Sequence, residues 1–293
     1  EECLERGLKI DDFAHRLSFF FNAHMDFFEE IAKYRAARRI WANRLKNQYG
    51  AKNESSLKLK FHTQTAGCSL TAQQPENNIV RTAFEAMSAV LGGTNSLHTN
   101  SLDETLALPS EKAAKIALRT QQILAFETGV PNVADPLGGS WYIEELTDKL
   151  EKQATKYFEE IQDMGGTVQA IEDGYFQKKI AESASIYQES VDSKERIIVG
   201  VNDFVEEDEE LDIEILKISR DAQDAQENKI KILRQSRDEK TLQEKIKNLK
   251  DACEKDLNLV PFLIEVAEQG GTVGEIVEIM KNVYGEWEES FGI

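Results

Sequence analysis

Cysteine is scarce in this chain, which has 293 residues and three cysteines. They are far apart, at Cys3, Cys68 and Cys253, and no two of them form a C-x-x-C pair. A disulfide scaffold or a zinc ribbon needs paired, closely spaced cysteines, so both are excluded. Such sparse use of cysteine is typical of a reducing compartment and predicts a soluble, cytoplasmic protein.

Long apolar stretches and a surplus of positive charge are also lacking. No apolar run approaches the roughly 18 residues that cross a bilayer, and residues 1–10 have neither the basic start nor the apolar stretch of a signal peptide. The 35 Lys and Arg face 53 Asp and Glu, which gives a net charge of −18. Because an acidic surface is repelled by nucleic acid and by anionic membranes, neither is expected as a partner.

The short motifs of metal, phosphate and nucleophile sites are absent as well. The 4 histidines form no i, i+4 pair and no H-E-x-x-H motif, which argues against a zinc centre. Neither G-x-x-x-x-G-K-[ST] nor G-x-G-x-x-G occurs, and no G-x-S-x-G marks a nucleophilic serine. The Gly92-Gly93 pair is interpreted as a helix C-cap.

What the sequence does contain is an alternation of short strands with long helices. The predicted strands are 17–22, 57–64 and 94–100, and the predicted helices are 25–45, 79–91 and one that Pro109 and Ser110 open. Strands that are joined by long helices pair in parallel, so this order predicts an α/β fold. Three such units are too few for an eight-stranded barrel and leave sheet edges uncovered, so we expect that part of the fold lies outside this sequence.

The remainder of the chain is predicted to be mainly helical. The predicted elements are a helix at about 144–163, a strand at 195–201, an acidic hinge at 206–212 and helices from 213 to the end. Two Gly-Gly-Thr sequences, at 165–167 and 270–272, are interpreted as a glycine turn followed by a threonine N-cap.

Each predicted strand ends in a polar residue, namely Asn22, Gln64 or Asn100. Active sites of α/β folds lie at the carboxyl ends of parallel strands, so the site is expected there. Strand alternation predicts that His62 and Gln64 face the same way, as do His98 and Asn100. Such a polar barrel interior suggests a channel for a polar ligand; the alternative is that buried histidines and amides satisfy one another.

Five collinear segments resemble the catalytic subunit of methylmalonyl-CoA mutase. They are RLSFFFNAHMDFFEEIAKYRAARRIWA (16–42), HTQTAGCSLT (62–71), NNIVRTAFEAMSAVLGG (77–93), SLHTNSLDETLALP (96–109) and DPLGGSWYIEELT (135–147). The resemblance covers nearly the whole chain and implies a partial (β/α)8 TIM barrel, its C-terminal strands and helices, at 1–205. A helical linker or association segment would follow at 206–293. The first half of the barrel and the D-x-H-x-x-G signature of a cobalamin-binding domain have no counterpart here.

The resemblance implies a radical isomerase that uses adenosylcobalamin to interconvert (R)-methylmalonyl-CoA and succinyl-CoA. In such an enzyme the cofactor carries the difficult chemistry, and the protein orients the substrate in a closed, dry site. The implied partners are an acyl-CoA substrate, the N-terminal barrel half and a cobalamin-binding domain or subunit, in a hetero-oligomer. Three alternatives stay open: a related isobutyryl-CoA-type mutase, a non-catalytic structural subunit of a mutase complex, and a fragment that only associates through the helices of 213–293.

The resemblance also implies roles for single residues. Asn100 and Glu104 match positions that hydrogen-bond the adenosyl ribose, and Gln64 matches a polar residue under the corrin; these three are the implied catalytic residues. Leu108 matches an apolar neighbour of the cofactor, and Cys68 stands where Trp is common. The positions that match the coenzyme A channel are Arg16, Ser18, His62 and Asn95, the last in place of a typical Gln. No residue is implied as a metal ligand.

Overall fold

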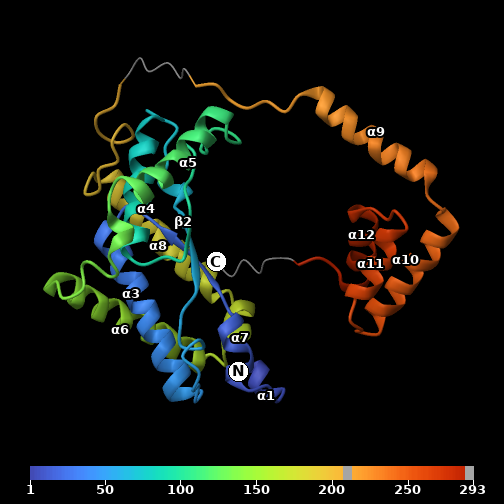
Figure 1. The fold of residues 1–293 in the computed structure, drawn as a ribbon, viewed down its shortest axis with the longest axis horizontal. Coiled ribbons are helices and arrows are strands. Elements are labelled where there is room, and N and C mark those ends of the chain that lie inside the picture. The colour runs from blue at the N-terminus through green and yellow to red at the C-terminus, as the bar shows by residue number, and fades with distance from the viewer. Residues whose placement is uncertain (207–212, 288–293) are drawn as a thin grey trace. The chain divides into compact units, whose positions relative to one another are not determined.

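The computed structural model describes residues 1–206 and 213–287 of the chain. The chain divides into two compact units, Glu1–Leu216 and Lys217–Ile293 (Figure 1). Nearly all of the acidic segment 206–212, which the sequence predicts as a hinge, lies outside the described residues. No helix within the described ranges combines the length and the apolar character that a membrane span requires.

The first unit contains a parallel sheet with strand order β1-β2-β3. The strands are β1 (Phe19–Ala23), β2 (Phe61–Thr65) and β3 (Ser96–His98), and the helices that follow each of them are α3 (Phe27–Asn43), α4 (Asn77–Leu91) and α5 (Glu111–Phe126). Because neighbouring strands are parallel and a helix lies in each crossover, the fold is α/β, as the sequence predicts. This connectivity is that of consecutive units of a (β/α)8 barrel.

Several short elements flank these units. They are α1 (Glu2–Glu5), α2 (Ile10–Phe13), the 3₁₀ helices η1 (Ala14–Arg16), η3 (Gly67–Ser69) and η4 (Val130–Asn132), and the π-helical turn η2 (Arg44–Gln48) that extends α3. Side-chain caps determine where two of the long helices begin. The Asp26 carboxylate accepts from the backbone N–H of Glu29 at the start of α3. The Ser110 hydroxyl accepts from that of Ala113 at 3.2 Å, so the predicted N-cap of α5 is confirmed.

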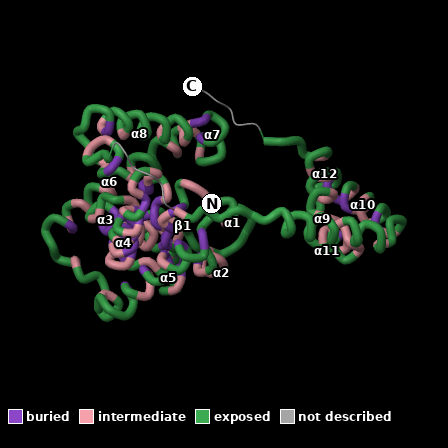
Figure 2. Tube along the Cα trace, turned by 90° about the horizontal axis from the view of Figure 1, so that it is seen from above, coloured by how far each residue is buried: buried purple, intermediate pink, exposed green. Residues whose placement is uncertain are grey.

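One face of the sheet packs against α3 and α4 and forms the core of the first unit. Along β2 the side chains of Phe61, Thr63 and Thr65 are buried, while the residues between them are only half-buried. Tyr34 of α3 stacks on Phe61 with ring centroids 5.2 Å apart, and burial of a side chain like Phe61 contributes roughly 1.5–3 kcal/mol. Figure 2 shows buried residues gathered on α3 and α4.

Gly92 ends α4 as the predicted C-cap. A Cβ atom at this position would lie 2.3 Å from Tyr34 Cδ2. Glycine is therefore required for the close approach of the α4 terminus to the buried ring.

Three further helices belong to the first unit: α6 (Trp141–Asp163), α7 (Thr167–Glu172) and α8 (Tyr175–Asp192). The guanidinium of Arg35 on α3 donates to the carboxylates of Asp135 and Glu144, at 2.9 and 2.7 Å, and so holds α6 against α3. The predicted N-cap at Thr167 is wrong, because Gly166 caps α7 and Thr167 is its first residue. Gly166 has φ 102°, a conformation that favours glycine at the cap.

The strand predicted at 195–201 is also wrong. The segment forms turns with a single isolated bridge, Val199 to Asp203. The side chain of Asn202 takes the place of a partner strand: its Oδ1 accepts from the Ile198 N–H at 2.7 Å, and its Nδ2 donates to the Val191 and Arg196 carbonyls, each at 2.8 Å. A β-branched run is thereby held as a loop.

The second unit contains α9 (Arg220–Ser236), α10 (Glu239–Glu254), α11 (Val260–Glu268) and α12 (Val273–Tyr284). Helical structure was expected from residue 213, but the first helix begins at Arg220. The core of this unit is formed by Leu242, Leu249, Cys253 and Val266, which lie on α10 and α11. Thr272 caps α12 in a capping box with Glu275, which confirms the predicted N-cap.

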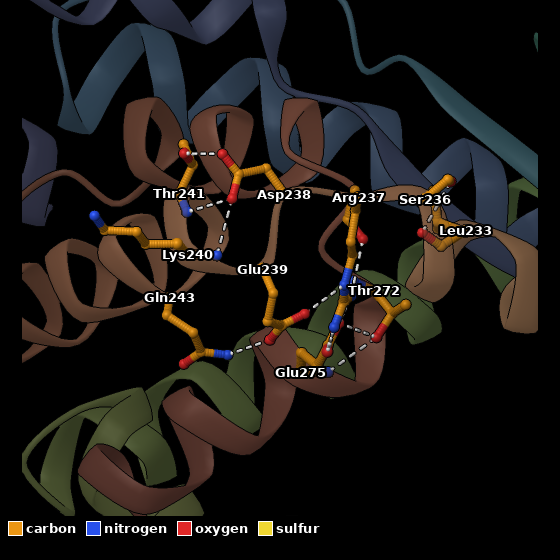
Figure 3. A network of polar contacts seen from close by, with 11 residues as sticks. Leu233, Ser236, Arg237, Asp238, Glu239, Lys240, Thr241, Gln243, Thr272 and Glu275 are labelled. Atoms are coloured by element: carbon orange, nitrogen blue, oxygen red, sulfur yellow. Dashed lines mark hydrogen bonds and ion pairs between the residues drawn. The ribbon is translucent and has the colours of Figure 1, made fainter.

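A polar network centred on Arg237 fastens the start of α10 to the start of α12 (Figure 3). The Arg237 guanidinium donates to both oxygens of Glu275, at 2.6 and 2.9 Å, and to the Gly270 carbonyl at 3.1 Å. The hydrogen bonds from Arg237 lower the pKa of Glu275 to about 2. The carboxylate therefore stays ionised and keeps this bidentate contact at neutral pH.

Candidate functional site

Polar side chains occupy the face of the sheet that does not pack on α3 and α4. Strand register arranges the residues of this face in two rows: the aromatic Phe20 with the polar His62 and Ser96 in the first, and Asn22, Gln64 and His98 in the second. In the first row His62 Nδ1 lies 2.6 Å from Ser96 Oγ, and the Phe20 and His62 ring centroids are 5.0 Å apart. The prediction that His62 and Gln64 share a face is confirmed.

The alternation does not continue from His98 to Asn100, because β3 ends at His98. Asn100 is buried, with 2% of its surface exposed, whereas His98 is exposed. Its side chain belongs instead to a hydrogen-bonded group at the carboxyl edge of the sheet.

Asn100 and Glu104 form a contact pair at this edge. Asn100 Nδ2 donates to Glu104 Oε1 at 3.0 Å. Thr65, the last residue of β2, donates its hydroxyl to Asn100 Oδ1 at 3.1 Å. The end of one strand thus orients the amide that follows the next strand, and the amide in turn orients the carboxylate.

The surroundings of Glu104 combine exposure with partial desolvation. The residue is exposed overall, yet burial of its carboxyl raises the pKa above its usual value; nearby Asp103 adds to this effect and His98 opposes it. A Cβ atom at Gly67, in the loop after β2, would lie 2.6 Å from Glu104 Oε1 and 3.0 Å from Asn100 Nδ2. Glycine at position 67 therefore leaves the space that the pair occupies.

The other two residues implied at the cofactor lie near this pair in the chain. Gln64 is half-buried and immediately precedes Thr65, beside Asn22 and His98. Leu108 follows Glu104 in the same loop and is 61% exposed. The carboxyl edge thus carries an amide–carboxylate pair with a second amide one strand away.

The four residues implied in the coenzyme A channel lie toward the amino ends of the strands. Arg16 ends η1 and Ser18 immediately precedes β1, and both are exposed. Asn95 precedes β3 and uses its Oδ1 to accept from the Phe61 N–H at 3.0 Å, which ties it to the start of β2. His62 lies in the first polar row. These positions and those implied at the cofactor are therefore separated along the strands.

Sequence reasoning missed His24, which directly follows β1. Its Nδ1 accepts from the Met25 N–H at 2.7 Å, which assigns the proton of the neutral ring to Nε2. Burial, and then the charge of Arg196, lowers the pKa of His24, so the neutral ring is favoured. The available signal was its position two residues after the predicted strand 17–22.

His24, Cys68 and Tyr187 all line two adjacent cavities, of about 700 and 650 Å³. The ring of Tyr187 lies 6.3 Å from that of His24 and 5.1 Å from the Arg196 guanidinium carbon. The cavities join the loop after β2 to α8 and to residues 196–201. No group of three or more His, Cys, Asp or Glu side chains suited to a metal ion occurs in the part of the chain that the structure describes.

Comparison with known proteins gives a consistent result. The family model described as methylmalonyl-CoA mutase matches residues 1–286. The chain is 45% identical over 290 residues to the 2-hydroxyisobutanoyl-CoA mutase large subunit of Aquincola tertiaricarbonis, and 46% identical over 287 residues to the methylmalonyl-CoA mutase of Rhizobium meliloti. It is also 45% identical over 285 residues to the human mitochondrial methylmalonyl-CoA mutase. These alignments cover 97–99% of the chain but only 52%, 40% and 38% of the three relatives.

Proposed function

The chain belongs to the methylmalonyl-CoA mutase family, and from this premise we propose that it supplies part of the active site of an adenosylcobalamin-dependent acyl-CoA mutase. Residues 1–205 contribute C-terminal strands and helices of the barrel, and residues 206–293 contribute a helical association segment. The other barrel strands and a cobalamin-binding domain come from the same polypeptide or from another subunit. The proposed reaction is the radical 1,2-rearrangement that interconverts (R)-methylmalonyl-CoA and succinyl-CoA.

The observation that carries this proposal is the Asn100–Glu104 pair. A carboxylate that is exposed at a sheet edge, and held there by a buried amide, is suited to bind a ligand with neighbouring hydroxyl groups. A structural subunit without such a ligand has no use for an amide buried at the cost of desolvation beside a carboxylate. The pair therefore favours the catalytic component over the structural one.

The donors and acceptors at this edge fit the adenosyl ribose. The Glu104 carboxylate can accept from ribose hydroxyls. Asn100 Nδ2 carries two N–H groups, of which one points at Glu104, so the other can donate to a ribose oxygen. Gly67 adds no side chain beside the pair. Asn100 and Glu104 would therefore hold the adenosyl group, with Gln64 and Leu108 toward the corrin.

The chemistry that adenosylcobalamin supplies when bound is homolysis of its cobalt–carbon bond, which yields the radical that starts the rearrangement. This chain's own residues bind and orient. Asn100 and Glu104 would hold the ribose, and the two rows on the sheet face would provide hydrogen-bonding partners along the barrel for the acyl-CoA arm. Arg16, Ser18, His62 and Asn95 would contact that arm, and closure of the barrel would exclude water.

The relatives favour two substrates for testing. (R)-methylmalonyl-CoA is proposed first, because several relatives carry the name of that mutase. The chain covers 52% of the 2-hydroxyisobutanoyl-CoA mutase large subunit. The name of that relative makes 2-hydroxyisobutanoyl-CoA the second candidate substrate. Both acyl-CoA esters belong in the same assay.

The test uses the complete mutase that contains this chain, reconstituted with adenosylcobalamin, and compares Glu104→Ala with the wild type. Loss of a hydrogen bond to a charged group is worth about 1.5–3 kcal/mol, so turnover should fall at least about tenfold. Native mass spectrometry should show the same complex for both proteins. Glu159→Ala, which removes an exposed carboxylate on α6, is the matched control and should keep full turnover.

Unchanged turnover in Glu104→Ala would contradict the ribose-binding role. A wild-type complex that retains no cobalamin and converts neither ester would instead favour a non-catalytic structural subunit.

A further inference from the structure

Asn78, in the first turn of α4, is fully buried, and its carboxamide meets four polar groups. Oδ1 accepts from the Thr71 N–H at 3.0 Å and from Arg81 Nη1 at 2.8 Å. Nδ2 donates to the backbone carbonyls of Thr71 and Leu102, each at 2.9 Å. Since a backbone N–H can only donate and a carbonyl can only accept, the orientation of the amide is fixed.

These contacts join two loops at the carboxyl edge of the sheet. Thr71 lies in the loop after β2, which also contains Gly67. Leu102 lies in the loop after β3, between Asn100 and Glu104. The buried Asn78 side chain therefore connects the loop after β2, which contains Gly67, to the loop after β3, which contains the Asn100–Glu104 pair.

Arg81, one turn further along α4, extends the connection to a third segment. Its Nη1 also donates to Thr71 Oγ1 at 2.8 Å, and its Nη2 donates to the Val199 carbonyl at 2.7 Å. Asn78 and Arg81 thus bring residues 71, 102 and 199 to one buried point on α4.

Three residues of the loop that carries the pair, Asn100, Leu102 and Asp103, form hydrogen bonds to other segments. The Asn100 N–H donates to Thr65 Oγ1 at 2.9 Å, and Asp103 Oδ2 accepts from the Ser110 N–H at 2.8 Å. Between these two, the Leu102 carbonyl accepts from Asn78. That contact comes from α4 and falls midway in the sequence between the two residues of the pair.

We propose that Asn78 is a positioning residue for the Asn100–Glu104 pair, acting through the Leu102 carbonyl. The identity of the ligand rests on the proposed function, but the positioning of the loop does not. Without the contact to Leu102 the loop can rotate between residues 100 and 104, and the 3.0 Å contact between Asn100 Nδ2 and Glu104 Oε1 is lost.

Asn78→Asp tests the proposal with little change in size. The new side chain keeps an oxygen toward the Thr71 N–H and Arg81, but presents its second oxygen to the two carbonyls where an N–H was. Asn77→Asp is the matched control: it makes the same chemical change one residue earlier, where Asn77 Nδ2 contacts the Gln74 side chain at 3.0 Å. Both are made in the complete mutase that contains this chain.

The readouts are hydrogen exchange of the amides of residues 101–108 and the affinity for 5′-deoxyadenosine, the free nucleoside, measured by calorimetry. For Asn78→Asp we expect faster exchange in this loop, unchanged exchange in α3, and affinity reduced about tenfold, as for a buried donor lost. Asn77→Asp should change neither readout. Should Asn78→Asp fail to fold, Asn78→Ser, which keeps a small hydroxyl donor, is expected to give the same changes to a smaller extent.

A double-mutant cycle separates positioning from general destabilisation. If Asn78 acts through the pair, Asn78→Asp should weaken nucleoside binding much less in a Glu104→Gln background, whereas a merely structural effect would be additive. Unchanged loop exchange in a folded Asn78 variant, or full additivity in the cycle, would overturn the proposal. If the wild type does not bind the nucleoside, the proposed function fails, and the exchange of residues 101–108 still decides the role of Asn78.

Discussion

The hydroxyl of Thr65 contacts Asn100 twice: it donates to Asn100 Oδ1 at 3.1 Å and accepts from the Asn100 backbone N–H at 2.9 Å. Thr65 ends β2, and Asn100 follows β3. Both residues are buried, so neither hydrogen bond has water as a substitute. The geometry of the candidate site therefore depends on a contact between the ends of two neighbouring strands.

Thr65→Val should disturb this contact selectively, because valine has nearly the same shape and lacks the hydroxyl. The buried N–H of Asn100 would lose its partner, which costs about 1–3 kcal/mol of unfolding free energy. We expect this loss in denaturant unfolding of the full chain, together with lower turnover of the assembled enzyme. Thr82→Val is the control, since the buried Thr82 Oγ1 has no hydrogen-bond partner among the described residues; valine leaves no group unpaired there, so the free energy of unfolding should not fall. Equal effects of the two substitutions would contradict the role given to Thr65.

Gly67→Ala should displace the Glu104 carboxylate without unfolding the chain. The new Cβ would lie 2.6 Å from Glu104 Oε1, the end of a flexible side chain that can move away. We expect weaker binding of 5′-deoxyadenosine, measured by calorimetry on the assembled enzyme, with an unchanged melting temperature. Gly274→Ala, in the first turn of α12, is the comparison, because a Cβ there meets no described atom within 4 Å; neither stability nor nucleoside affinity should fall. A Gly67→Ala enzyme with wild-type nucleoside affinity would show that the pair does not need this space.

Glu85 predicts a pH dependence of stability in the first unit. It is fully buried on α4, and burial raises the pKa of its carboxyl from 4.5 to about 7. Between these two pH values the folded state holds a proton that the unfolded state releases. The free energy of unfolding therefore falls as the pH rises from about 4.5 to about 7.

Glu85→Gln removes this titration. The variant should match the wild type near pH 4.5 and exceed its stability above pH 7 by on the order of a few kcal/mol. Hydrogen exchange of the α4 amides across this pH range measures the difference within the first unit. Glu76→Gln, an exposed substitution just before α4, should show no such divergence. A stability difference that does not depend on pH would exclude titration of Glu85 as the cause.

Local signals explain which parts of the fold the sequence predicts. Ser110 and Thr272 cap their helices through contacts within three residues, so a short window contains the cause. The run at 195–201 was misread because its β-branched residues favour a strand, whereas Asn202 supplies the backbone partners that hold it as a loop. Thr167 was misread because the conformation of Gly166 determines the cap.

In the candidate site, the sequence identifies the residues of the pair but not the contacts that position them. Asn100 and Glu104 are four residues apart, and the resemblance identified both, but their contact depends on groups distant in the chain. Thr65 is 35 residues from Asn100, and Asn78 is 24 residues from Leu102. Such contacts arise from strand register and from the packing of α4. His24 was missed for the same reason, because Tyr187 and Arg196 reach it only in the folded chain.

The two polar rows on the sheet face have a spacing that any strand imposes. Two residues along a strand rise about 7 Å, so the row of His62 and the row of Gln64 are separated by that distance. A ligand lying lengthwise on this face meets hydrogen-bonding groups at fixed steps. If the acyl-CoA arm lies along this face, as proposed, its length measured from the row of His62 would determine which of its atoms lies beside Asn100 and Glu104.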